Sequence, residues 1–427
     1  HGVVVLIEVD QSHRRPILLL DQTGAHRLPV LVAQGSGDPD GAGAFDDRAE
    51  ARHQATASAS GLERAVIGPA KRQWPTIGDD QDLAVGHGMS VVVGQDGAVK
   101  VLAAPDKFRG SASAIDVARA IAAGAERSGA AARELPLADG GEGTLAVLGG
   151  ANRVTTVTGP LGDPVEAPWR LHRGEAVIEM ASASGLDLVG GPEGTDPLAA
   201  RPAGTGELIL AAVDLGARRI IVGWGGSATT DGGLAALRSL YPLPRLKGVE
   251  LIVACDVDTP FLEAAETFAP QKGASPAQVA LLSRRLQRVA EVYREDHDVD
   301  VTVRAGAGAA GGLAGGLMVA GGRLQAGFDL VADEVDLDGA LTGIDLVFTG
   351  EGRLDRQSFS GKVVGGVADW AAERGVPVVA IVGDVDEGAT PPMPVVSLVE
   401  RFGAERSFAE PLACITEVAA AEVAARS

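Results

Sequence analysis

The chain has 427 residues, of which 46% are hydrophobic and 22% charged, and its formal net charge is −20. The length allows two or more domains with separate cores, and the acidic balance argues against a nucleic-acid partner, which requires a broad basic face. Two cysteines, Cys255 and Cys414, cannot form a disulfide framework or a four-ligand zinc site. The low cysteine content makes a reducing, cytoplasmic setting the expectation. No apolar run approaches the ~20 residues of a membrane helix, so we expect no membrane partner, and the protein is expected to be a monomer or homodimer.

Residues 1–98 differ in texture from the rest of the chain. Five of the seven histidines lie there, and residues 34–60 are a polar mixture of Ala, Gly, Asp and Ser without helical or strand period. Such a composition buries too little apolar surface to offset the entropy lost on ordering. We therefore predict that residues 1–98 are a poorly ordered or non-native extension rather than a functional domain, with Met89 as a natural start of the protein.

From Val99 onwards, short apolar runs alternate with segments of helical period. This alternation predicts a mainly parallel sheet covered by helices, whereas short runs and turns between residues 150 and 190 predict antiparallel strands. We expect strands at 99–104, 219–222, 249–254, 299–303, 345–348 and 377–382, and helices at 113–128, 205–215, 234–240, 275–295, 362–374 and 411–426.

The expected fold class is α/β with two α/β domains. Residues 99–149 and 249–427 would form a mainly parallel, Rossmann-like domain. A smaller mixed-sheet domain, residues 150–248, would interrupt it, and the active site would lie in the cleft between them.

Polar glycine loops follow five of the strand candidates: Asp106-Lys107, Gly225–Asp231, Asp256–Asp258, Glu351–Asp355 and Asp384–Asp386. Ligands of parallel sheets bind at the carboxyl ends of the strands, so we expect these loops to converge on one edge. Backbone N–H groups, Lys and Arg suit phosphates, and carboxylates suit Mg²⁺. The loops together indicate phosphoryl transfer to an alcohol, although each single Asp is more often a solvated turn residue.

The segment from Arg219 to Gly233 is the strongest candidate for an anion site. An apolar strand opens into a run of small residues, and a helical pattern resumes at Leu234. Such a turn presents unpaired backbone N–H groups, to which Ser227, Thr229 and Thr230 add hydroxyl donors. The alternative is a tight turn whose glycines only supply positive φ and close packing.

We compared three glycine-containing segments with the known nucleotide-binding motifs. Gly361-Lys362 is followed by Val363, where a Walker A loop requires Ser or Thr. Two dinucleotide-type matches, Gly223-x-Gly225-x-x-Ala228 and Gly306-x-Gly308-x-x-Gly311, follow strand-like runs. They keep an NAD(P)-dependent oxidoreductase of small hydroxy acids as an alternative function, and a non-catalytic sensor of organic acids is a second.

Seven strings, in order between about Val99 and Ser427, resemble the glycerate kinase family of the bacterial two-domain type. They are Ala104-Pro-Asp-Lys-Phe-Arg-Gly-Ser, Pro136-Leu-Ala-Asp-Gly-Gly-Glu-Gly-Thr, Gly225-Gly-Ser-Ala-Thr-Thr-Asp-Gly-Gly, Ala254-Cys-Asp-Val-Asp, Ala269-Pro-Gln-Lys-Gly-Ala, Gly306-Ala-Gly-Ala-Ala-Gly-Gly and Thr349-Gly-Glu-Gly-Arg-Leu-Asp. The chain departs from the family pattern in a shorter segment at 240–248 and in Thr259, where Asn is usual.

This resemblance implies ATP-dependent phosphorylation of D-glycerate to a phosphoglycerate, with Mg²⁺. Members of this type are usually taken to phosphorylate the 2-hydroxyl, which would make the product 2-phosphoglycerate.

The candidate site residues combine the resemblance with the chemistry of each loop. We predict catalytic roles for Asp106, Lys107, Asp231 and Arg353. Substrate or phosphate binding is predicted for Gly225, Gly226, Ser227, Thr229, Lys272, Gly350, Gly352 and Lys362, and Mg²⁺ ligation for Asp256, Glu351 and Asp355. Lys107 and Arg353 would neutralise phosphate or the glycerate carboxylate, and Asp231 or Asp106 would orient the acceptor hydroxyl.

Overall fold

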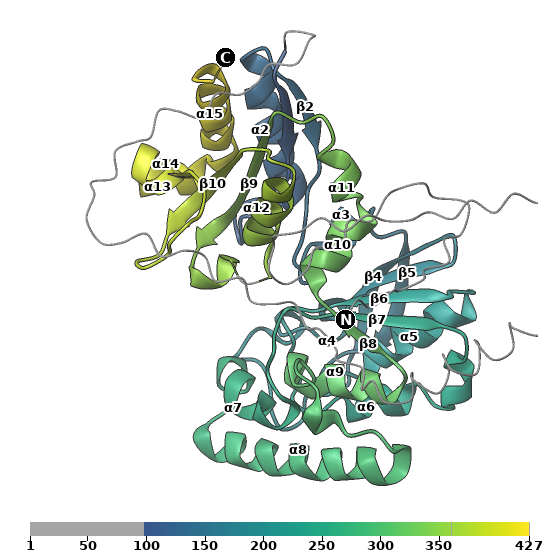
Figure 1. Ribbon diagram of the computed structural model, residues 1–427. Coiled ribbons are helices and arrows are strands. Elements are labelled where there is room, and N and C mark those ends of the chain that lie inside the picture. The colour runs from purple at the N-terminus through teal and green to yellow at the C-terminus, as the bar shows by residue number, and fades with distance from the viewer. Residues whose placement is uncertain (1–97, 360, 427) are drawn as a thin grey trace, which may run out of the picture. The chain divides into compact units, whose positions relative to one another are not determined.

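A computed structural model describes residues 98–359 and 361–426. The extension predicted for residues 1–98 lies outside the described residues apart from Ala98. The described strands form one five-stranded and one six-stranded sheet, and helices cover both (Figure 1).

The five-stranded sheet is parallel throughout, with strand order β11-β10-β9-β1-β2. Its strands are β1 (Lys100–Ala103), β2 (Ala131–Glu134), β9 (Leu346–Leu354), β10 (Val378–Val385) and β11 (Val395–Ser397). Side chains alternate between its faces. Val101 packs in the core that holds α2 (Ala114–Arg127) and α15 (Pro411–Ala424), and Leu102 packs in the core that holds α10 (Gly327–Glu334) and α12 (Val363–Glu373).

The six-stranded sheet is mixed, with order β3-β4-β5-β6-β7-β8. Its strands are β3 (Arg153–Thr158), β4 (Pro164–His172), β5 (Glu175–Glu179), β6 (Arg219–Gly223), β7 (Glu250–Ala254) and β8 (Arg323–Gln325). The first three pair antiparallel, and β5 to β8 pair parallel. The parallel and mixed sheets of the expected α/β fold class are thereby confirmed.

The described α-helices are α2 (Ala114–Arg127), α3 (Thr144–Val147), α4 (Ala181–Ser184), α5 (Ala203–Asp214), α6 (Leu234–Ser239), α7 (Ala264–Phe268), α8 (Pro276–His297), α9 (Ala309–Val319), α10 (Gly327–Glu334), α11 (Leu337–Ala340), α12 (Val363–Glu373), α13 (Leu398–Phe402), α14 (Ala404–Ala409) and α15 (Pro411–Ala424). Short 3-10 turns are η2 (Asp187–Val189), η3 (Leu243–Leu246), η4 (Phe261–Glu263), η5 (Pro270–Lys272), η6 (Val301–Val303) and η7 (Arg356–Phe359).

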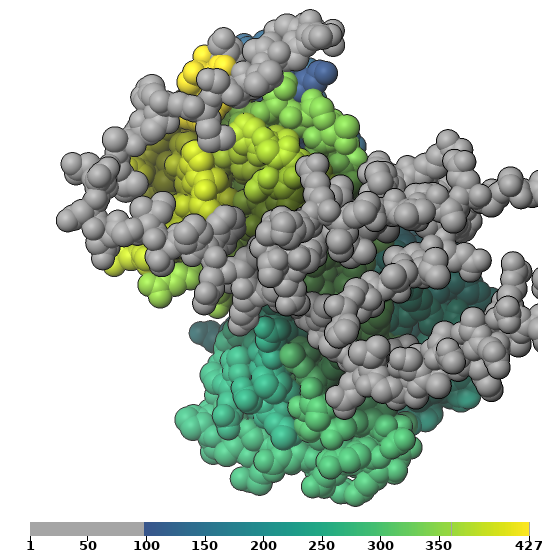
Figure 2. Space-filling model, viewed as in Figure 1, coloured from purple at the N-terminus to yellow at the C-terminus, as the bar shows by residue number. Residues whose placement is uncertain are grey.

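Two of the predicted helices begin at capping residues visible in the sequence. Ser113 accepts a hydrogen bond from the backbone of Asp116 at the start of α2, and Ser275 and Gln278 form a capping box at the start of α8. Along α8, Leu282, Leu286 and Tyr293 are buried, whereas its other face belongs to the molecular surface (Figures 1 and 2).

The strand pairing corrects the domain boundary expected at residue 248. Strands β7 and β8 continue the mixed sheet beyond β6, with Ile220 opposite Leu251 and Val253 opposite Leu324. The segment that forms the mixed sheet therefore extends at least to Gln325 and is larger than expected. An apolar run such as Glu250–Ala254 fits either parallel sheet, so its pattern alone could not identify its neighbours.

The strand predicted from the alternation of Val299, Val301 and Val303 is also wrong. Residues Val301–Val303 form a 3-10 turn, because the Asp300 carboxylate accepts the Thr302 N–H at 2.9 Å and closes the backbone into a turn.

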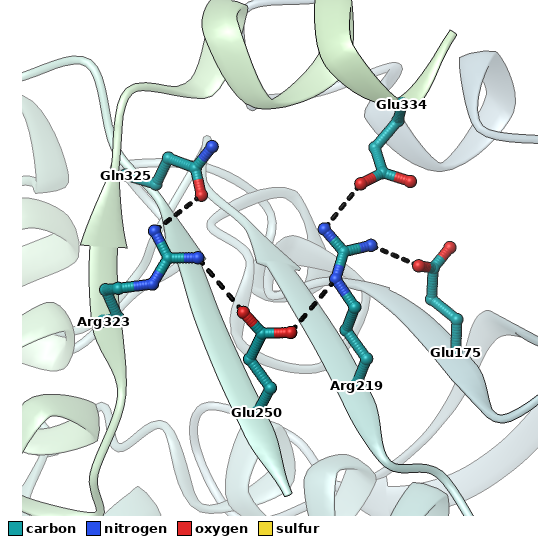
Figure 3. Close-up of polar contacts among 6 residues, drawn as sticks. All are labelled: Glu175, Arg219, Glu250, Arg323, Gln325 and Glu334. Atoms are coloured by element: carbon teal, nitrogen blue, oxygen red, sulfur yellow. Dashed lines mark hydrogen bonds and ion pairs between the residues drawn. The ribbon is translucent and has the colours of Figure 1, made fainter. Parts of the chain in front are cut away.

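An ion-pair network joins the amino-terminal ends of the parallel strands of the mixed sheet (Figure 3). Arg219 contacts Glu175, Glu250 and Glu334, and Arg323 lies 3.2 Å from the other oxygen of Glu250. The residues are partly exposed, so each pair contributes little by itself. The network marks the edge of the sheet opposite to the polar glycine loops. No helix among residues 98–359 and 361–426 is both long and apolar enough to cross a bilayer.

Candidate active site

A pocket of about 520 Å³ lies at the carboxyl ends of β6 and β7. Its walls include segments Asp139–Gly141, Trp224–Ser227 and Ala254–Val257, together with Arg109 and Lys272. It therefore contains the predicted residues Gly225, Gly226, Ser227, Asp256 and Lys272, which come from three of the strings that carry the resemblance. We call it the glycine pocket.

The segment Gly225–Asp231, which we call the glycine loop, supplies unpaired backbone donors to this pocket. The N–H groups of Gly225, Gly226 and Ser227 have no hydrogen-bond acceptor among the described residues. Two backbone hydrogen bonds fix the position of the loop. The Leu186 N–H donates to Gly226 O at 2.6 Å, and the Ala228 N–H donates to Ser184 O at 3.0 Å. Consecutive free N–H groups on a fixed loop form an anion-binding concavity.

Lys272 and Asp231 hold the glycine loop through hydrogen bonds to its backbone and to the start of α6. Lys272 is only 3% exposed, and its Nζ donates to Thr229 O at 2.6 Å. Both carboxylate oxygens of Asp231 accept backbone N–H groups, from Gly233 at 2.9 Å and Ala235 at 3.0 Å. Asp231 therefore fixes the start of α6, and because each of its oxygens already accepts a backbone N–H, the structure favours a structural role for it over the predicted catalytic role. Thr229 is fully buried and belongs to the same support.

The burial of Lys272 predicts a distinctive pH dependence of stability. Burial lowers the pKa of Lys272 to about 7, against the opposing effect of Asp231. Between that value and its ordinary pKa of 10.5, the unfolded chain binds a proton that the folded chain does not, so stability rises with pH in this window. We expect the free energy of unfolding of the wild type, minus that of Lys272→Met, to increase from pH 7 to pH 9 by at most about 1.4 kcal/mol per pH unit.

Urea denaturation of both proteins at the two pH values measures this difference. Because Lys272→Met lacks the titrating group but keeps an unbranched side chain, titrations elsewhere cancel in the subtraction. An unchanged difference would show that Lys272 stays protonated in the folded protein.

Asp256 and Asp139 form the acidic wall of the glycine pocket. Asp256 Oδ1 accepts the Gly327 N–H at 2.5 Å, whereas its Oδ2 is buried without a hydrogen-bond partner among the described residues. Burial, reinforced by Asp139, raises the pKa of Asp256 to about 7. Asp139 was not predicted as a site residue, although it stands in the Pro136–Thr144 string. Its position after β2, in a loop rich in Gly and acidic residues, was the available signal.

A second polar group consists of Asp106, Lys107, Glu351 and Lys362, which come from the segment after β1, the second half of β9 and the start of α12. Lys107 Nζ is 3.7 Å from Asp106 Oδ1 and 4.0 Å from Asp139 Oδ1, so it connects this group to the glycine pocket. Burial raises the pKa of Asp106 to about 6 and that of Glu351 to about 7, in spite of nearby Lys107 and Lys362. Carboxyl groups perturbed in this way are typical of functional sites.

The three predicted magnesium ligands are divided between these places. Asp256 lines the glycine pocket, and Glu351 belongs to the second group. Asp355 accepts hydrogen bonds from Gln357 and Ser358 and shapes the η7 turn. Among the described residues, no three or more His, Cys, Asp or Glu side chains are grouped as a metal site. Mg²⁺ is nevertheless compatible, because it commonly takes one or two carboxylates plus phosphates and water, and Asp256 Oδ2 and Glu351 Oε1 are buried without partners.

Arg353, Gly350 and Gly352 lie outside the glycine pocket. The Arg353 side chain is 72% exposed and pairs with Asp386. A Cβ atom on Gly350 would lie 1.9 Å from Ile381 O, so this glycine permits the close pairing of β9 and β10. Gly352 allows the loop at Phe108 and Arg109 to approach β9. The structure gives all three a local structural role, and their binding to phosphate stays a prediction.

The loops at the strand ends do not converge on one sheet edge as predicted, because the strands belong to two different sheets. Loops after β1, β9 and β10 follow the five-stranded sheet, whereas those after β6 and β7 follow the six-stranded sheet, so they do not share one edge. Asp139 lies between Lys107 and Asp256 and connects the two sets. The predicted loops Glu351–Asp355 and Asp384–Asp386 lie largely within β9 and β10, where Asp384 is paired with Arg353 and Val385 with Leu354. The Arg353 side chain also forms an exposed ion pair with Asp386.

Neither dinucleotide-type match has the geometry of a dinucleotide-binding turn. That fingerprint requires a strand to pass directly into a helix. After β6 ends at Gly223, however, α6 begins only at Leu234, and the segment before Gly306 is the η6 turn rather than a strand. The structure therefore contradicts the local basis of the oxidoreductase alternative.

The comparisons with known proteins agree with this geometry. A model of the glycerate kinase family matches residues 101–241 and 242–417. A glycerate 2-kinase from Escherichia coli (strain K12) is 40% identical over 329 residues, which cover 68% of this chain and 86% of that protein. A glycerate kinase from Haemophilus influenzae is 41% identical, with coverages of 68% and 87%.

A solved structure agrees with the sequence comparisons. The crystal structure of a glycerate kinase 2 candidate from Salmonella typhimurium LT2 superposes with a TM-score of 0.64 at 35% identity, covering 77% of this chain and 98% of that one. The resemblance predicted from seven strings is confirmed, and with it the expectation of a phosphotransferase. The chain belongs to the glycerate kinase family.

Proposed function

We propose that this enzyme transfers the terminal phosphoryl group of ATP to the 2-hydroxyl of D-glycerate and releases 2-phosphoglycerate. The observation that carries the proposal is the glycine pocket, whose lining combines three unpaired N–H groups, the carboxylates of Asp139 and Asp256, and an arginine without a partner among the described residues. Both substrates are anions with oxygen-rich groups, and this combination of donors and carboxylates suits them. The 2-hydroxyl is proposed from the family resemblance and from the name of the Escherichia coli relative.

The residues of the site divide the work according to their positions. The N–H groups of Gly225, Gly226 and Ser227 would bind phosphate oxygens. Lys107 would neutralise charge on the transferred group, since it extends from the second polar group to Asp139. Asp139 lines the pocket and would accept the hydrogen bond of the acceptor hydroxyl, a role for which Asp106 lies less directly placed.

Asp256 is the residue best suited to hold Mg²⁺, through its unpartnered Oδ2. A bound Mg²⁺ would supply positive charge to the phosphates of ATP. Glu351, with its unpartnered Oε1, is a second candidate ligand. Asp256 itself is held by the Gly327 N–H, so its orientation does not depend on the ion.

ADP release in the presence of D-glycerate, its enantiomer or hydroxypyruvate tests the proposal. We expect ADP release with D-glycerate only, and only when Mg²⁺ is present. NADH oxidation with hydroxypyruvate, without ATP turnover, would establish the oxidoreductase instead. Binding of D-glycerate without either reaction would establish the sensor. The proposal includes a cytoplasmic enzyme that is a monomer or homodimer, and sedimentation analysis decides the oligomeric state.

A further inference from the structure

We infer that Arg109 recognises the carboxylate of the acceptor and thereby makes the enzyme specific for hydroxy acids over neutral polyols. This inference rests on the proposed function and identifies the specificity-determining residue of the same pocket. Arg109 belongs to the loop that follows β1, and it lines the glycine pocket together with Asp139 and Asp256.

The fold presents Arg109 on a fixed turn. Its neighbour Phe108 is 3% exposed and packs into the core of the five-stranded sheet. Phe108 and Ala112 exchange two backbone hydrogen bonds of 2.9 Å, which close the turn around Arg109. Gly352 packs against the backbone of the same turn, since a Cβ atom there would lie 3.1 Å from Arg109 N. The backbone of Arg109 is therefore held on both sides while its side chain is exposed.

Among the described residues that line the glycine pocket, Arg109 is the basic residue whose charge is not engaged by a protein group. Its guanidinium has no hydrogen-bond or ion-pair partner among the described residues. The other basic residue that lines the pocket, Lys272, is buried and donates to Thr229 O. Arg353, in contrast, already pairs with Asp386. A pocket that contains Asp139 and Asp256 but leaves its arginine unpaired has a cation reserved for a ligand.

The chemistry of the two substrates favours the carboxylate over the nucleotide phosphates as the partner of Arg109. The phosphates have the loop N–H groups, and they would arrive with a divalent cation. The acceptor carboxylate brings no counter-ion of its own. A guanidinium binds a planar carboxylate through two parallel hydrogen bonds, which provide orientation as well as charge neutralisation. Fixing the carboxylate in this way would present one hydroxyl of the acceptor to Asp139.

Steady-state kinetics of Arg109→Gln with D-glycerate and with glycerol test the inference, because glycerol replaces the carboxylate by a neutral CH₂OH group. We expect kcat/KM for D-glycerate to fall about 10²-fold, KM for ATP to stay within about twofold, and the preference for D-glycerate over glycerol to fall by the same 10²-fold. Arg109→Lys should recover part of the preference, because it keeps the charge without the fork. Arg119→Gln, which removes an exposed arginine from α2, is the matched control and should behave as wild type.

Two results would overturn the inference while leaving the proposed function intact. An Arg109→Gln enzyme with raised KM for ATP and an unchanged preference would place Arg109 at the nucleotide, and an enzyme with wild-type constants would show that it binds neither substrate. Calorimetric titration with D-glycerate alone adds a readout independent of turnover, with binding expected for wild type and lost in Arg109→Gln. If the wild type neither binds nor phosphorylates D-glycerate, the proposed function and the inference fail together.

Discussion

Asp256→Asn is expected to lower kcat/KM by about 10²-fold, the order of loss that follows removal of a preorganised charge-stabilising group. The substitution keeps the shape of the side chain and an oxygen able to accept the Gly327 N–H, but it removes the negative charge of the unpartnered Oδ2. Because Asp256 would hold Mg²⁺, the Mg²⁺ concentration that gives half-maximal rate should also rise. Initial rates over a series of Mg²⁺ concentrations measure both effects.

Asp329→Asn is the control for Asp256→Asn. Asp329 lies in the first turn of α10, close enough to contribute to the raised pKa of Asp256, but it does not line the pocket. We expect its kinetics to stay within about threefold of wild type, in the range of a screened charge. Equal effects of the two variants would mean that general negative charge, rather than a ligand at Asp256, accounts for the loss.

Gly311→Ala is expected to destabilise the protein by about 3 kcal/mol, because backbone strain and overpacking combine. Gly311 has φ +70°, and a Cβ atom there would lie 2.0 Å from Thr229 O and 2.7 Å from Thr230 Cα. Relief of this overlap must displace the backbone of the glycine loop, so the surviving folded enzyme should also lose activity. Urea denaturation and kcat/KM at a temperature where the variant is folded measure the two effects.

Gly321→Ala separates backbone strain from overpacking. Gly321 has φ +92°, but a Cβ atom added there would meet no other atom within 4 Å, so only the strain of positive φ applies and the cost should be about 1 kcal/mol. This variant should keep its activity, since Gly321 follows α9 at the end away from Thr229. Similar losses of stability and activity in both variants would contradict the contact between Gly311 and the loop.

The sequence predicted local features where a pattern has one physical solution. Alternating strands and helices required parallel pairing, and the caps at Ser113 and Ser275 marked two helix starts. The seven strings identified the family. The sheet to which Glu250–Ala254 belongs could not be predicted, because strand neighbours depend on long-range packing that a short apolar run does not encode.

For the candidate site, the sequence predicted which loops reach the pocket but not which of their charged side chains do. The Gly225–Ser227 loop and Asp256 reach one pocket, as strand-end loops should. Asp231 and Lys272 look in the sequence like charged groups for a ligand, but Asp231 is satisfied by backbone N–H groups and Lys272 by a carbonyl. Whether a charged side chain binds a ligand or an internal backbone group depends on whether it is buried. Burial is set by the packing of the whole folded chain, so the sequence pattern alone could not predict it. Asp139 shows the reverse case, since an ordinary loop carboxylate proved to line the pocket.

Phosphorus NMR of D-glycerate incubated with the enzyme, ATP and Mg²⁺ tests the central claim most directly. We expect the terminal phosphate resonance of ATP to decrease while ADP and the phosphomonoester of 2-phosphoglycerate appear in equal amounts. A spectrum in which ATP and D-glycerate persist unchanged, with the enzyme folded and Mg²⁺ in excess, would contradict the proposed phosphoryl transfer.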